Sequence, residues 1–200
     1  MSLRIWAIKI GELKPLSRAG LLLFGARCAL RVEPWLPPAA APLWSRGLNH
    51  VVNSAFSVTD SEPIAKLRRD LSDRGAMACN ELATTNEPLG RCMNYTTQIL
   101  ASALDAIALD DASALKKEVI QAAKLSASIP AILAHAGRIE VPSGSSAVDV
   151  ACVTVWDAIR ADIAAVANAV PAIERAEDRV LALTKCAPLW PGEVPAWVTQ

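Results

Sequence analysis

Residues 92–109 read CMNYTTQILASALDAIAL, and this stretch decides the fold. It carries a single charge, Asp105, among apolar and small residues. Such a segment is typical of an α-helix that neighbouring elements cover on more than one side. A carboxylate in that setting needs a partner or serves a function, because an unpaired buried charge costs much free energy.

The composition around this stretch is that of one folded domain. The chain has 200 residues, of which 52% are hydrophobic and 20% charged, and this excludes a disordered chain. Lys and Arg together equal Asp and Glu together, which argues against a nucleic-acid binder. We expect a single helical domain over residues 1–200, with a hinge at 141–145 between two sub-bundles.

Helical periods and helix-breaking residues predict about seven α-helices, and therefore an all-α bundle with short connections. Outside the central stretch, the predicted helices begin with residues 15–33, 42–56 and 61 onward, the last fraying from Gly75 to a loop at 84–90. A helix at 112–127, capped by Asp110-Asp111, is broken or kinked at Pro130, continues for a further turn or two at 129–136 and stops at Gly137. The last two predicted helices cover residues 146–170 and 171 onward. The most regular stripe advances in steps of three and four through Val148, Cys152, Val155, Ile159, Ile163, Val166 and Val170.

The two ends of the chain have weaker patterns. Ser2–Ile10 alternates weakly, and we expect an extended N-terminal arm packed on the bundle. Leu189–Gln200 is rich in Trp and Pro and has no helical period, so we expect an extended C-terminal tail across the bundle.

The spacing of the cysteines and the apolar runs of the sequence indicate the cellular compartment of the protein. The five Cys are scattered without a C-x-x-C pair, and only two His accompany them, so we expect no metal site and reduced thiols. Spacing leaves open whether Cys79 and Cys92 form a bridge. Ala19–Leu30 resembles the apolar part of a signal peptide, but Arg27 interrupts it, and no uncharged apolar run reaches 18 residues. We therefore expect a cytoplasmic protein without a membrane span.

Three pieces of the sequence, in order, resemble the YjaG-like bacterial proteins, an all-helical family of unknown function. Ala29–Leu36 (ALRVEPWL) resembles the C-E-R-x-x-P-N-Y element that ends the family's first helix. Ala103–Ala106 (ALDA) resembles its A-[IL]-D-A element, and Val155–Arg160 (VWDAIR) resembles its W-E-x-x-R element. The first match departs from the family where Ala29-Leu30 replaces Cys-Glu and Trp35-Leu36 replaces Asn-Tyr. The resemblance implies an all-helical bundle and supplies no activity.

The same pattern is similar to helical immunity proteins of bacterial toxin systems. That similarity implies a bacterial protein that neutralises a toxin by binding it. Motif matches of this kind are hypotheses that the structural context has to support.

Asp105 admits two interpretations. It pairs with Arg31, Arg27 or Arg160 in a structural network that fixes three helices, or it lines a site around Asp105, Arg31 and Arg160 that serves a small-ligand binder or an enzyme. We favour the structural network, because the matched elements contain Arg31, Asp105 and Arg160 together. This hypothesis predicts a markedly lower melting temperature for Asp105→Ala.

Tryptophan is unusually frequent, with six Trp against one Tyr and two Phe. Trp35, Trp44, Trp190 and Trp197 fall in connectors and in the tail, where they either pack on the bundle or form a partner surface. No pattern indicates a catalytic residue, a cofactor or a metal. We expect a non-enzymatic interaction protein with a protein partner, and the alternative of a homo-oligomer through the helix at 148–170 stays open.

Overall fold

The computed structural model describes residues 8–56, 63–137 and 147–170, and these ranges contain helices and no strand. The described α-helices are α1 (Arg18–Leu30), α2 (Ala41–Ala55), α3 (Ile64–Leu82), α4 (Glu87–Ile107), α5 (Ala112–His135) and α6 (Ala147–Ala169). Three short 3-10 helices accompany them, namely η2 (Ile10–Leu13), η3 (Glu33–Trp35) and η4 (Pro38–Ala40). The all-α fold class is therefore confirmed.

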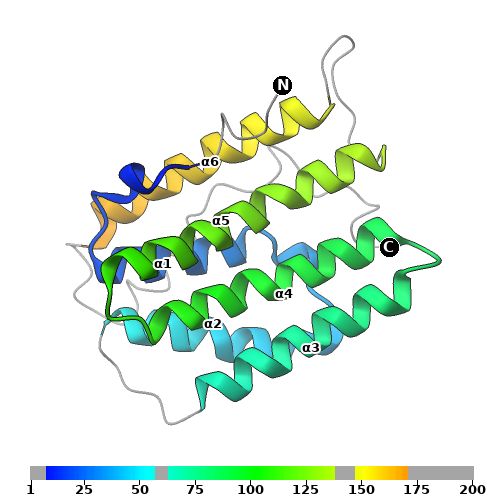
Figure 1. The fold of residues 1–200 in the computed structure, drawn as a ribbon, viewed down its shortest axis with the longest axis horizontal. Helices are drawn as coiled ribbons and strands as arrows, with labels where there is room; N and C mark the ends of the chain where they lie inside the picture. The colour runs from blue at the N-terminus through cyan, green and yellow to red at the C-terminus, as the bar shows by residue number, and fades with distance from the viewer. Residues whose placement is uncertain (1–7, 57–62, 138–146, 171–200) are drawn as a thin grey trace.

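The helices lie side by side along the long axis of the molecule. In Figure 1, α3, α4, α5 and α6 follow one another from bottom to top, and α1 and α2 lie behind them. Consecutive helices in this row pack against each other, and α1 packs against α2, α4, α5 and α6. The result is a two-layer bundle in which α1 is enclosed.

Helices α1 and α4 form the centre of the bundle. Every residue from Gly20 to Ala29 is buried, which makes α1 the most enclosed described helix. Helix α4 contacts α1, α2, α3 and α5, so the expectation that residues 92–109 are covered on more than one side is confirmed. The buried stripe of α6 is also confirmed for Val155, Ile159, Ile163 and Val166.

Side chains satisfy the ends of the central helices. The Ser17 hydroxyl accepts the Gly20 N–H at 3.2 Å, and the carboxylate of Asp111 accepts the Ala114 N–H at 2.6 Å. The guanidinium of Arg18 donates to the carbonyl oxygens of Ile107, at 2.8 Å, and of Leu109. These bonds pair backbone groups that a helix terminus leaves without partners, and the positive charge suits the C-terminal end of α4.

The expected boundary between α3 and α4 was wrong, whereas the expected end of α5 near Gly137 is confirmed. Helix α3 does not fray at Gly75 but continues to Leu82, and α4 begins at Glu87, so the connection is shorter than the loop expected at 84–90. Gly75 is retained inside the helix because α4 approaches it closely at Thr97. Helix α5 continues through Pro130 to His135, and Gly137 follows with φ +67°, as expected of a residue that ends a helix.

The other expectations on the ends and the hinge lie outside the described residues. They concern most of the N-terminal arm, the hinge at 141–145, the helix from Pro171 and the tail at 189–200.

Candidate functional site

Within the described ranges, the buried charged residues lie where the end of α1 meets α6. Arg27 of α1, Arg31 directly after α1 and Asp162 of α6 are 2%, 4% and 1% exposed. Nε and Nη2 of Arg27 donate to Oδ1 of Asp162 at 3.2 and 2.8 Å, while Nη2 of Arg31 donates to Oδ2. Nη2 of Arg31 also donates to the carbonyl oxygen of Ala158 at 3.3 Å. One carboxylate thus joins two arginines and holds α6 against α1.

The expected pairing of Asp105 with Arg27, Arg31 or Arg160 is wrong. Asp105 pairs instead with Arg68 of α3, whose Nε lies 2.6 Å from Oδ1, and the two side chains are 37% and 47% exposed. The physical reason is the position of Asp105 on α4. It belongs to the partly exposed stripe of that helix, which is Tyr95, Gln98, Ser102 and Asp105.

Arg160 forms a third, separate charge cluster. Its Nε donates to Oε2 of Glu12 at 3.0 Å, and its Nη1 donates to Oδ1 of Asp157 at 3.4 Å. Oε1 of Glu12 accepts the Lys9 N–H at 2.9 Å. Partial burial opposes ionisation of Glu12, but the Lys9 N–H and the charge of Arg160 outweigh it and lower the pKa of this carboxyl. The structure therefore does not join Asp105 to Arg31 or Arg160.

Sequence reasoning missed Asp162 although a signal was present. Asp162 lies three residues after Ile159 and four before Val166, so it shares the buried face of the stripe that defines α6. A charge on the most regular apolar face was a stronger indication of a buried ion pair than Asp105 was.

Trp35 and Trp44 belong to the core, so for these two residues packing on the bundle is the alternative that holds, and the partner surface is excluded. Trp35 is buried because η3 packs on α4. Trp44 is one of the buried residues of α2, which packs against α1, α3 and α4. Trp190 and Trp197 lie outside the described residues.

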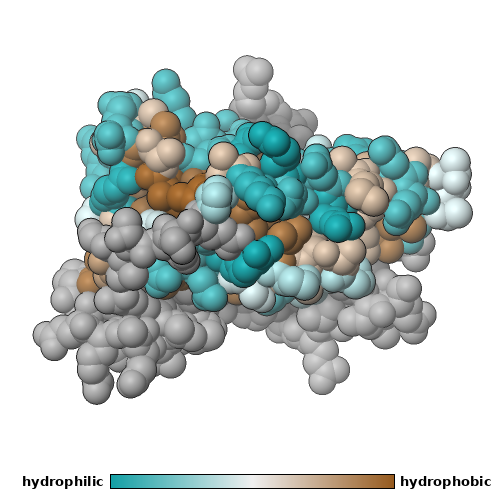
Figure 2. Space-filling model, turned by 90° about the horizontal axis from the view of Figure 1, so that it is seen from below, coloured by the Kyte–Doolittle hydropathy of each residue, from teal (hydrophilic) through white to brown (hydrophobic). Residues whose placement is uncertain are grey.

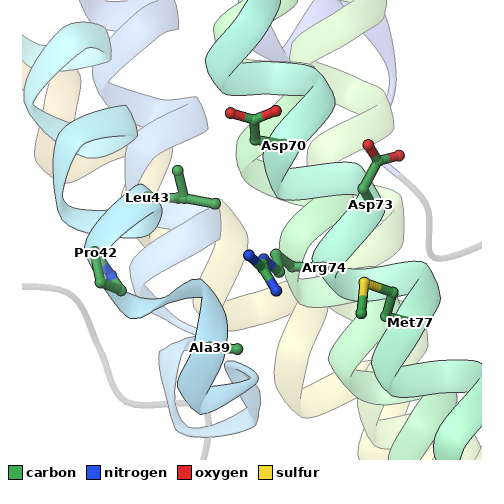
Figure 3. Close-up of a pocket in the computed structure, with 7 residues that line it drawn as sticks. All are labelled: Ala39, Pro42, Leu43, Asp70, Asp73, Arg74 and Met77. Carbon is green, nitrogen blue, oxygen red and sulfur yellow. The ribbon is translucent and has the colours of Figure 1, made fainter.

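The described surface contains a groove between the start of α2 and the outer helix α3. Figure 3 shows it, and we call it the η4–α3 groove. Its volume is about 530 Å³, and it is open to solvent. It is lined by Ala39, Pro42, Leu43, Asp70, Asp73, Arg74 and Met77.

The lining residues of α3 share one face because they are spaced at three, four and seven residues. In Figure 3 the Leu43 side chain points toward α3, and the guanidinium of Arg74 reaches toward η4 and α2. Met77 is 50% exposed. Figure 2 views this side of the molecule, where hydrophobic residues form a band among hydrophilic ones.

A second open groove lies between the start of the described chain and α5. It has a volume of about 500 Å³ and is lined by Ile8, Ile10, Lys117, Glu118, Ile120, Gln121 and Lys124. Ile10, at 46% exposure, and Met77 are the exposed large hydrophobic residues of the described ranges, and each borders one groove. The sequence offered one signal for the first groove, which is the apolar Met77 on the polar face of α3.

The remaining observations concern metals, thiols and membranes. Within the described ranges, no group of three or more His, Cys, Asp or Glu is arranged to hold a metal ion. Cys79 and Cys92 are free thiols, so the bridge left open by their spacing is not formed. Among the helices described, none is both long enough and apolar enough to cross a bilayer.

Comparison with known proteins adds no relative. The chain matches no protein-family model, no curated protein and no solved structure.

Proposed function

We propose that this chain is a non-enzymatic helical interaction protein and that it binds a protein partner at the η4–α3 groove. One observation carries the proposal. Met77 is half exposed in an open groove, and the charged residues around it, Asp70, Asp73 and Arg74, form no ion pair with other described residues.

The groove has the composition of a protein-binding surface. Ala39, Pro42, Leu43 and Met77 supply an apolar centre, and charged side chains supply the rim. The flexible thioether of Met77 adapts to the shape of a bound side chain. Helix α3 has a free face for such contacts, because among the described elements its close packing partners are α2, α4 and η4.

The finer proposal is a bacterial, cytoplasmic immunity protein that neutralises a toxin by occluding it. Its support is the similarity of the sequence pattern to helical immunity proteins, together with a groove suited to a protein partner. Binding of this kind requires a surface and no catalytic group on the immunity protein.

A site-specific crosslink tests the proposal. A photo-reactive residue replaces Met77 in the full-length chain inside the native host, and a second variant carries the same residue at Ala65. Ala65 is a suitable control because it is an exposed residue of the same helix, more than 100° from Met77 around the helix axis by the ~100° step per residue. We expect one partner to crosslink at position 77 and not at position 65.

Growth assays then test the finer proposal. Expression of the captured partner alone should arrest growth, co-expression of this chain should relieve the arrest, and the variant Met77→Glu should not relieve it. Equal crosslinking at positions 65 and 77, or none at either, would overturn the binding proposal. A captured partner that is harmless when expressed alone would overturn the immunity proposal.

A further inference from the structure

The second groove, which lies between the start of the described chain and α5, has an apolar lining. We call it the α5 groove. Ile8 and Ile120 are 4% and 7% exposed, and the half-exposed Ile10 also lines the groove. Its volume of about 500 Å³ lies in the range of small-molecule sites, which is about 300–1,000 Å³. An apolar group of a ligand would leave water on entering this groove, and burial of apolar surface is favourable.

Polar side chains of α5 line the same groove. Lys117, Gln121 and Lys124 are exposed and share one face of α5, because they are spaced at four and three residues. Lys117 and Lys124 are two helical turns apart, or about 10 Å. A helix pairs opposite charges at three or four residues, and no acidic residue lies at these distances from either lysine. Neither ammonium group forms an ion pair with another described residue.

The described residues around the α5 groove carry an excess of positive charge. Residues 8–14 and 116–124 contain five lysines and two glutamates, so their net charge is +3. Arg160 and Asp157 of α6 contact this region through Glu12, and their charges cancel each other. A basic balance of this kind favours an anionic ligand.

The acidic residues near the groove do not reverse this balance. Glu12 accepts a hydrogen bond from Arg160 at 3.0 Å and is thereby committed to an internal cation. Glu118, the acidic residue of the lining, is half-buried and lies about 100° from Lys117 around the helix axis. Asp111 caps the start of α5 and lies about 9 Å along the helix from Lys117. The basic groups of the groove therefore outnumber its acidic ones.

We infer that the α5 groove binds an anionic amphiphile, that is, a single-chain molecule with an apolar tail and a carboxylate or phosphate head group. The tail lies against Ile8, Ile10 and Ile120, and the head group accepts hydrogen bonds from the ammonium groups of Lys117 and Lys124. Such charge-assisted bonds are stronger than those between neutral groups. The inference is independent of the proposed function, because the α5 groove and the η4–α3 groove have no lining residue in common.

Three soluble amphiphiles with the same tail test the inference, namely decanoate, decyl phosphate and decyltrimethylammonium. Each is added below its micelle concentration to the full-length, isotope-labelled chain, and NMR locates the contact and measures weak affinities. Vesicles of phosphatidylglycerol and of phosphatidylcholine form a separate arm, which distinguishes a free amphiphile from an anionic membrane surface.

We expect decanoate and decyl phosphate to shift the signals of residues 8–10 and 117–124 and to bind at least about tenfold more tightly than decyltrimethylammonium. The double variant Lys117→Gln/Lys124→Gln should weaken binding of decanoate roughly three- to tenfold, the size expected of two exposed ion pairs. The matched control is Lys66→Gln, which changes an exposed lysine of α3 outside the groove. It should leave the affinity unchanged.

A further variant tests the contact with the tail. Ile10→Ser should weaken binding of decanoate roughly threefold, because it removes apolar surface from the groove. The chain should stay folded in this variant, since Ile10 is already half exposed.

Several results would overturn the inference. They are equal affinity for the anionic and the cationic amphiphiles, insensitivity to the double variant, and signal shifts that fall outside residues 8–10 and 117–124. Binding of the phosphatidylglycerol vesicles without binding of either free anionic amphiphile would also overturn it, since the occupant would then be a membrane surface.

Discussion

Asp162 and Asp105 show how burial determines the contribution of a paired carboxylate to the stability of the fold. Asp162 is enclosed with two arginines, and its removal leaves those cations in a buried site without their shared anion. Loss of one partner from a buried ion pair costs about 3–5 kcal/mol. The exposed pair of Asp105 with Arg68 contributes about 0–1 kcal/mol.

Thermal unfolding of two variants tests this contrast. We expect Asp162→Ala to lower the melting temperature by roughly 6–20 °C, since about 1 kcal/mol corresponds to roughly 2–4 °C in a chain of this size. Asp105→Ala should lower it by no more than about 4 °C, which revises the expectation from the sequence. Equal shifts in the two variants would contradict the assignment of the buried network to Asp162.

Glu12 gives a pH-dependent contribution to stability. Its pKa lies below the ordinary value of 4.5 because the Lys9 N–H and Arg160 stabilise the charged form. A carboxyl with a lowered folded-state pKa stabilises the fold above its unfolded pKa, and the contribution is lost as the pH falls through the folded pKa.

Comparison of the wild-type chain with Glu12→Gln tests whether the stabilisation by Glu12 decreases as the pH falls. Denaturant unfolding should show the wild type as the more stable chain at pH 6–7, and the difference should shrink steadily below pH 4.5. The matched control is Asp110→Asn, which removes an exposed carboxyl in the connection between α4 and α5. A difference that grows on acidification would contradict the interactions assigned to Glu12.

At the scale of elements, the tight contact between α3 and α4 depends on Gly75. A Cβ atom added to Gly75 would overlap the hydroxyl oxygen of Thr97. It would also lie 3.1 Å from Asn94 Oδ1 and from Thr97 Cβ, which is tighter than an ordinary van der Waals contact. The Thr97 hydroxyl cannot turn away without losing its bond to the Asn94 carbonyl oxygen at 2.9 Å. Substitution at Gly75 therefore forces the two helices apart.

Gly75→Ala should lower the free energy of unfolding by about 1–2 kcal/mol. The overpacked Cβ destabilises the fold by about 1–3 kcal/mol, and the higher helix propensity of alanine offsets up to about 1 kcal/mol of this. Chemical denaturation measures the change, and the cost should be smaller in a Thr97→Ala background. Gly11→Ala, whose Cβ meets nothing within 4 Å, should change stability by less than about 0.5 kcal/mol. Equal effects of the two substitutions would exclude close helix approach as the reason for Gly75.

The helices could be predicted from the sequence more fully than the contacts between them. Apolar stripes and caps at Asp111 and Gly137 are local signals, and they located α5 and α6 correctly. Gly75 was misread because its cause, the approach of Thr97, is a tertiary contact. Asp105 was misread because Tyr95, Gln98 and Ser102, the other residues of its partly exposed stripe, carry no charge that would mark the stripe as exposed. For the η4–α3 groove the sequence offered only the apolar Met77 on the polar face of α3, because the shape of the groove depends on where η4 and α3 meet.

At the scale of the whole molecule, the reaction rates of the cysteine thiols measure how often the helical bundle unfolds. Cys28 and Cys92 are buried in the core, and burial raises the pKa of the Cys92 thiol to about 12. Cys79, on the outer helix α3, is only partly buried. Reaction with a thiol reagent requires access and a thiolate, so the core thiols should react only when the bundle opens.

Mass spectrometry after labelling at pH 8 measures these rates. In a background with Cys152 and Cys186 changed to Ser, Cys79 should react at least about a hundredfold faster than Cys92. In denaturant, Cys28 and Cys92 should become as reactive as Cys79 at the same denaturant concentration, because both belong to one core. Labelling of Cys92 at the rate of Cys79 in the native chain would contradict a closed core.

The junction of α1 with α6 also has a consequence during protein synthesis. Arg27 precedes its carboxylate partner Asp162 by 135 residues. A ribosome adding about 5–20 residues per second makes that partner roughly 7–27 s later. Until then, Arg27 and Arg31 lack this carboxylate, and a charged group favours water over an apolar interior. The ion pairs between the end of α1 and α6 therefore form only after α6 has been made.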